Sequence, residues 1–115
     1  MVEIAAIGFL IMGLVGLFSP QRMTALVDIA ELSAAGRNEV RAVYGGFGVV
    51  IGGLLLATVS EPELHEGVVL TVAVALLGMV AGRCLSWVIE RRIDVFPLLF
   101  MVGELLFAAG LLLAL

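Results

Sequence analysis

Four long apolar stretches constrain this chain more than any other feature. They cover residues 2–18, 40–59, 67–89 and 95–115, and the short segments between them hold most of the charged residues. A helix rises about 1.5 Å per residue, so a hydrocarbon core about 30 Å thick needs about 20 residues, with about 17 as the lower limit. Each stretch can therefore cross a membrane, the first only just. Because lipid offers the backbone no hydrogen-bond partner, each is expected to be helical.

The composition agrees with a protein whose solvent is lipid. Hydrophobic residues make up 63% of the chain and charged residues 14%, with a mean hydropathy of +1.24. Soluble domains run at about 45–50% apolar and about 25% charged residues. We therefore predict an all-α protein, a transmembrane four-helix bundle in one domain of residues 1–115. Its first partner is the lipid bilayer, whereas a net charge of −4 without any Lys argues against nucleic acid.

The segment between the first two stretches predicts a further, amphipathic helix at the membrane interface. Ser19 is a suitable N-cap, and Pro20 suits the first helical position. Gly36 is a natural C-terminal stop, and Asn38 can cap the next helix. The apolar positions recur at helical spacing and are Met23, Leu26, Val27, Ala30 and Ala34. An ordinary polar loop with local helicity is the alternative.

The arginines predict the orientation in the membrane. They lie within or close to the first and third connectors, whereas the second connector, residues 60–66, has no Lys or Arg. The positive-inside rule then places connectors one and three in the cytoplasm, with both termini and the acidic second connector outside. Residues 1–18 lack a basic leading region and a small-residue cleavage site. We therefore expect this stretch to be retained as a span rather than removed as a signal peptide.

Glu104 is the one charged residue within residues 95–115. An acidic side chain at the centre of a membrane helix costs about 2.5–3.5 kcal/mol, so it needs a partner. Few ionisable groups lie at comparable depth in the other stretches, and Asp94 lies nearer the interface. The polar cluster that these positions predict comprises Arg41, Tyr44, Arg83, Asp94 and Glu104.

Such a cluster has two interpretations, and the sequence leaves both open. It fixes the register of the helices as a buried ion pair, or it acts on a ligand or a proton. The leading function is a non-enzymatic accessory, assembly or subunit protein of the membrane. The alternative is a protein that binds a small ligand or couples transport to protons through Glu104 and Arg83. A cavity beside Arg41 and Arg83 would favour the alternative.

Enzymatic chemistry is the weakest reading of this sequence. No pairing of a nucleophile with a base and no set of metal ligands is visible, so we predict no catalytic residue, no metal site and no cofactor. Cys84 is the single cysteine, which rules out an intrachain disulfide and leaves no Cys-x-x-Cys motif for thiol–disulfide exchange. We expect Cys84 to be a small, buried hydrophobic residue.

Two pairs of glycines have the spacing that lets membrane helices approach closely. Gly48 and Gly52 lie on one face of the second stretch, and Gly78 and Gly82 on one face of the third. We expect these small-residue faces to serve helix packing within the bundle. The other reading is a seam with a second copy of the chain or with another membrane protein.

Several short motifs resemble a family of small bacterial four-helix membrane proteins, domain of unknown function 4345. They are Arg41-Ala42-Val43-Tyr44-Gly45-Gly46, Gly82-Arg83, Asp94-x-x-Pro97 and Gly103-Glu104. The resemblance covers essentially the whole chain, and the family is similar to the wider DoxX-like set of four-helix proteins. It implies a four-helix fold in a bacterial membrane and no particular activity. With the arginine pattern, the expected location is the inner membrane, with both termini on the periplasmic side.

Overall fold

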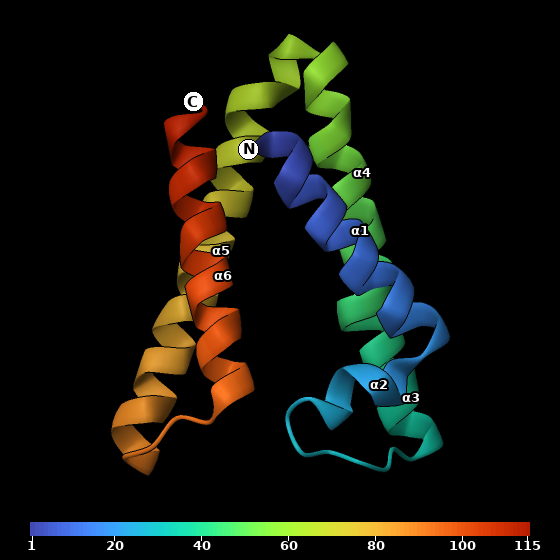
Figure 1. Ribbon diagram of the computed structural model, residues 1–115. Coiled ribbons are helices and arrows are strands. Elements are labelled where there is room, and N and C mark those ends of the chain that lie inside the picture. The colour runs from blue at the N-terminus through green and yellow to red at the C-terminus, as the bar shows by residue number, and fades with distance from the viewer.

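The computed structural model describes all 115 residues, and helices are its only regular secondary structure, which confirms the predicted all-α class (Figure 1). No strand is present. The helices are α1 (Val2–Phe18), α2 (Pro20–Ala25), α3 (Ala34–Val40), the π-helical turn η1 (Arg41–Gly46), α4 (Phe47–Ser60), α5 (Pro62–Glu90) and α6 (Val95–Leu113).

Three helices are long and apolar enough to cross a membrane. They are the continuous helix Ala34–Ser60, formed by α3, η1 and α4, and the helices α5 and α6, with 27, 29 and 19 residues. α1 is a shorter apolar helix of 17 residues and coincides with the first apolar stretch. α5 begins at Pro62, so most of the acidic second connector forms its first turns rather than a loop.

The amphipathic helix expected after α1 is much shorter than the pattern suggested. α2 has Ser19 as N-cap and Pro20 at its first position, as predicted, but it ends at Ala25. The N–H of Ile29 donates to the carbonyl of Thr24, and the N–H of Asp28 donates to that of Ala25. These two bonds form a Schellman motif, with Asp28 left-handed at φ 66°. The helix stops because Asp28 takes the position that usually calls for glycine.

Gly36 does not end a helix, in contrast to the prediction. The chain re-enters helix at Ala34, and Ser33 caps α3 by accepting a hydrogen bond from the N–H of Gly36 at 3.0 Å. Gly36 therefore lies in the first turn of α3, and Asn38 lies inside this helix rather than at its cap. A Ser three residues before an N–H is the usual capping geometry, so the sequence does carry the local signal for the start of α3, at Ser33 rather than at Asn38.

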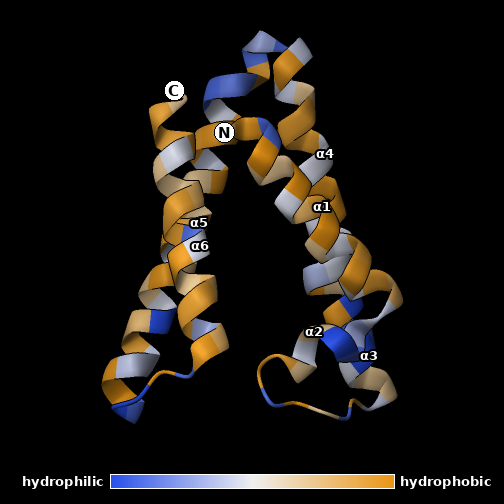
Figure 2. Ribbon diagram, viewed as in Figure 1, coloured by the Kyte–Doolittle hydropathy of each residue, from blue (hydrophilic) through white to orange (hydrophobic).

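The helices are arranged as two pairs that meet at one end and diverge toward the other (Figure 1). α1 packs along η1 and α4, and α5 packs along α6. Both chain termini and the turn between α4 and α5 lie at the end where the pairs meet, called the terminal end below. Residues 26–33 and 91–94 lie at the opposite, splayed end, called the loop end. Polar residues gather at both ends, with apolar residues between them (Figure 2).

The shared core lies near the terminal end. It consists of Val2, Ala5, Ala6, Leu55, Val69, Val72, Ala73, Leu76, Ala108 and Leu111. Toward the loop end the two pairs do not share a core, and the Cα atoms span only 17 Å in the thinnest direction. Only 20 of the 115 residues are buried, so most apolar side chains face outward, as lipid or a partner protein requires. The three long helices and α1 therefore do not enclose one core along their whole length.

The two glycine pairs have different surroundings. A Cβ atom on Gly48 would lie 2.9 Å from the Cα of Gly13, and one on Gly52 would lie 2.9 Å from the carbonyl oxygen of Ala6. These glycines thus allow α4 to contact α1 backbone to backbone. A Cβ atom on Gly78 or Gly82 would meet nothing within 4 Å, so neither serves close packing within the chain.

Two side chains on α5, Cys84 and His65, contact α6. Cys84, expected to be buried, is exposed on α5, with its Sγ 3.8 Å from the Sδ of Met101. His65 lies in the first turns of α5, where its Nε2–H donates to the carbonyl of Ala114 at 2.8 Å. The last carbonyls of a helix have no partner within it, so His65 satisfies one of them and links α5 to the end of α6.

Candidate functional site

Arg83 and Glu104 form a two-pronged ion pair between α5 and α6. The Arg83 Nε donates to Glu104 Oε2 at 2.8 Å, and Nη2 donates to Oε1 at 2.7 Å. About 10% of the Glu104 side chain and 27% of the Arg83 side chain are exposed. Paired bonds between the planar guanidinium and the carboxylate are short, strong and directional. The pair therefore holds α5 and α6 in one register and gives the deep carboxylate of Glu104 its partner.

Phe100 completes this site on the face of α6 that Glu104 occupies. It lies four residues before Glu104, and the Arg83 guanidinium carbon is 5.5 Å from the centre of its ring. Cations within about 6 Å of an aromatic ring are attracted by its electron-rich face. Sequence reasoning missed Phe100, although the four-residue spacing from Glu104 places the two side chains on one helix face.

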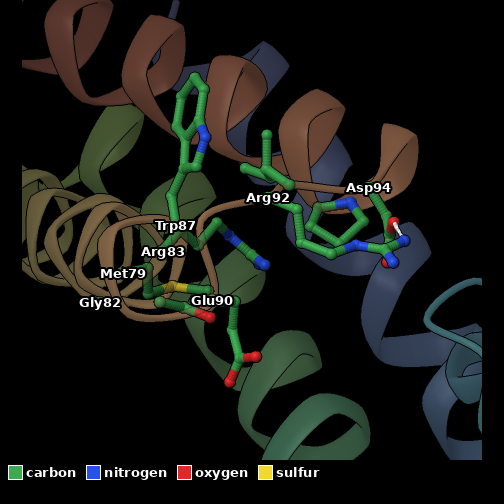
Figure 3. A pocket seen from close by; sticks show the side chains of 10 residues that line it. Met79, Gly82, Arg83, Trp87, Glu90, Arg92 and Asp94 are labelled. Atoms are coloured by element: carbon green, nitrogen blue, oxygen red, sulfur yellow. Dashed lines mark hydrogen bonds and ion pairs between the residues drawn. The ribbon is translucent and has the colours of Figure 1, made fainter.

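A hollow of about 550 Å³ lies beside Arg83, toward the loop end of α5 and α6. Figure 3 shows the residues around it, among them Trp87 and Glu90 of α5 and Asp94 at the start of α6. The Nη1 nitrogen of Arg83 makes no hydrogen bond within the chain. Because a guanidinium has five N–H donors, Arg83 can bind Glu104 and still donate to another group.

Asp94 pairs with a neighbour in sequence rather than with Glu104 or Arg41. Its carboxylate accepts a hydrogen bond from Arg92 in the connector between α5 and α6 (Figure 3). This bond raises the pKa of Arg92, which is positively charged at neutral pH in any case. Both side chains are at least half exposed, so solvent screens the pair and it adds little to stability.

Arg41 and Tyr44 do not bond to Arg83 or Glu104. Both belong to η1, on the other helix pair. The Arg41 Nε donates to the carbonyl of Leu17 at the end of α1, at 3.0 Å. The Tyr44 hydroxyl makes no hydrogen bond, and this side chain is exposed. Of the five residues of the expected cluster, Arg83 and Glu104 therefore bond to each other, Asp94 bonds to Arg92, Arg41 bonds to the carbonyl of Leu17, and Tyr44 makes no hydrogen bond.

The fold and this site together define a helical protein with three helices long and apolar enough to span a membrane and an Arg–Glu pair between two of them. The chain belongs to the family described as Domain of unknown function (DUF4345), whose pattern matches residues 1–115. The match to that family, first suggested by the motifs around Arg41, Arg83 and Glu104, is thus shown over the whole chain. No curated protein and no solved structure matches the chain.

Proposed function

We propose that this protein is a non-enzymatic accessory or assembly subunit that receives a transmembrane helix of a partner on one face of α5. In this proposal it is related to the DoxX-like proteins and spans the inner membrane of a bacterium four times. Its two helix pairs form a bundle that the partner helix completes. The observation that carries the proposal is the small-residue face of α5, which no other part of the chain covers.

That face follows α5 at helical spacing. Its members, all exposed, are Thr71, Ala75, Gly78, Gly82 and Ser86. Each glycine inside a helix costs about 0.8–1.0 kcal/mol relative to alanine. Gly48 and Gly52 offset this cost by close contact with α1, but Gly78 and Gly82 have no such contact. A partner helix packed on this face would supply the missing contact, because small residues let two backbones approach closely.

Gly78→Leu should abolish the partner contact and leave the fold intact. A Leu at this position has free space around its Cβ, so the chain itself can accommodate the larger side chain. The measurement is the apparent mass of the protein extracted from its own membrane in mild detergent, by native electrophoresis. We expect the unmodified chain to migrate with a partner or a second copy, and Gly78→Leu to migrate as a monomer.

Gly53→Leu is the matched control for this experiment. Gly53 is also an exposed glycine with nothing within 4 Å of a Cβ, but it lies on α4. The Gly53→Leu variant should therefore migrate with the same apparent mass as the unmodified chain. The proposal is wrong if the unmodified chain is already a monomer, or if Gly78→Leu migrates like the unmodified chain. Mass spectrometry of the complex then distinguishes a second copy from another protein.

The proposed orientation has its own test. With both termini in the periplasm, alkaline phosphatase fused to the C-terminus should be active, and a fluorescent protein at the same position should stay dark. The same reporters inserted between Asp28 and Ser33 should give the opposite pattern, because the arginine-flanked connector is expected inside. A fluorescent C-terminal fusion would contradict the orientation.

A second candidate function is the binding of a small polar or anionic ligand, or proton-coupled transport, at Arg83 and Glu104. The hollow of about 550 Å³ beside Arg83, together with the free Nη1 nitrogen, favours this alternative. Two facts weigh against it. The Glu104 carboxylate is already engaged by Arg83 at both oxygens, and Arg41 lies on a different hollow.

A further inference from the structure

A second hollow, of about 440 Å³, lies at the loop end of the other helix pair. Three arginines line it, Arg22 from α2, Arg37 from α3 and Arg41 from η1. No acidic residue is among the residues around it. Half of the arginines of this chain therefore meet in one place, although they are separated in sequence by the break between α2 and α3.

These arginines are positioned by backbone carbonyls rather than by carboxylates. Arg41 donates to the carbonyl of Leu17 at 3.0 Å, and Arg37 donates through Nη1 to the carbonyl of Leu32 at 2.7 Å. None of the three takes part in an ion pair, whereas Arg83 and Arg92 are both paired with acids. The hollow thus keeps three positive charges without a counter-charge, and most of their N–H donors remain free.

A phosphate group matches this arrangement best. The planar fork of a guanidinium bonds two phosphate oxygens at once, and several such forks can share one phosphate. The exposed ring of Phe18, the last residue of α1, lies at the edge of the same hollow. A charged hollow next to an apolar ring suits a group that is anionic at one end and apolar at the other, as a lipid headgroup is.

We propose that the hollow lined by Arg22, Arg37 and Arg41 binds a phosphate group, carried by the headgroup of an anionic lipid or by free phosphate. The site lies on the helix pair that contains α1 and α4, whereas the proposed partner face lies on α5 of the other pair. It therefore does not depend on the partner contact proposed above. Its position at the end of α1 is where the headgroups of one leaflet would lie if α1 spans the membrane.

Thermal unfolding of the purified full-length chain in detergent tests this site. Three probes are added separately: short-chain phosphatidic acid, phosphatidylcholine of the same chain length, and inorganic phosphate. A ligand that binds only the folded state raises the melting temperature, and the rise grows with the ratio of ligand concentration to Kd. We expect phosphatidic acid to raise it and phosphatidylcholine to leave it unchanged. A response to phosphatidic acid alone identifies a lipid headgroup, and an equal response to inorganic phosphate identifies the phosphate group itself.

The variants separate a built site from general attraction between charges. The Arg22 side chain is exposed and makes no hydrogen bond, so Arg22→Gln should fold normally and weaken phosphatidic acid binding about tenfold, as expected for the loss of one charged hydrogen bond. Arg22→Gln with Arg37→Gln should weaken it about a hundredfold. The control, Arg91→Gln with Arg92→Gln, removes the same charge at the same end of the molecule and should bind like the unmodified chain.

Two results would overturn this site. One is an unmodified chain that neither phosphatidic acid nor inorganic phosphate stabilises. The other is a control variant that loses binding as strongly as the variant of Arg22 and Arg37, because binding would then follow net charge rather than the hollow. Arg37→Lys gives a further check, since it keeps the charge but loses the planar fork, and its binding should fall below that of the unmodified chain.

Discussion

Arg83→Leu is expected to destabilise the protein by about 3–5 kcal/mol, the usual result of breaking a buried ion pair from one side. The change leaves the Glu104 carboxylate between two helices without either of its hydrogen bonds. Glu104→Gln should cost less, because an amide can still accept one bond from Arg83. The measurement is unfolding of the purified protein in mixed micelles, followed by helix content.

The double variant, Arg83→Leu with Glu104→Gln, decides whether the two side chains act as a unit. With both charges removed, no stranded charge remains, so part of the loss from Arg83→Leu should return. Arg92→Leu is the control, because it breaks an ion pair that is exposed to solvent, and it should leave unfolding unchanged. Losses that simply add in the double variant would mean that Arg83 and Glu104 do not interact.

The same cycle separates the two proposed functions. If the double variant is stable and still migrates with its partner in native electrophoresis, the pair serves to hold α5 against α6. The other outcome is a double variant that is stable and keeps its partner contact but no longer functions in the cell. In that case Arg83 and Glu104 act on a ligand or a proton. The hollow beside Arg83 would then be the place to look for that ligand.

Local patterns in the sequence predicted the helices better than their arrangement. Long stretches with a single charged residue each define α1 and α6 almost to the residue, since a segment that crosses lipid must satisfy its own backbone as a helix. The end of α2 was missed because Asp28 adopts the left-handed conformation that glycine normally takes at a helix end. An Asp in a polar connector does not by itself predict this conformation. The left-handed backbone of Asp28 costs free energy, and the two hydrogen bonds of the turn offset that cost.

The neighbours of each side chain were harder to predict, because they depend on contacts distant in sequence. The scarcity of charges in the apolar stretches limited the partners of Glu104 to a few residues, and the structure pairs it with Arg83. The same reasoning placed Arg41 nearby, but the end of α1 offers this side chain a carbonyl on its own helix pair. Helical periodicity identifies the face on which Gly78 lies and cannot say whether another helix of this chain covers it.

Gly13→Ala is expected to disrupt the contact between α1 and α4 and to destabilise the protein by about 1–3 kcal/mol. The added Cβ would lie 2.5 Å from the backbone nitrogen of Val49 and 2.9 Å from the carbonyl oxygen of Gly45. Neither atom can move without shifting the whole helix. The gain of about 1 kcal/mol in helix propensity from Gly to Ala offsets only part of this strain.

Gly53→Ala is the matched control, because it makes the same change on α4 where nothing lies within 4 Å of the added Cβ. Only the gain in helix propensity then remains, so the control should be slightly more stable than the unmodified chain. The opposite signs of the two substitutions, measured by unfolding in the same micelles, test the backbone contact directly. If Gly13→Ala proved as stable as Gly53→Ala, α1 and α4 would not approach each other as closely as the structure has them.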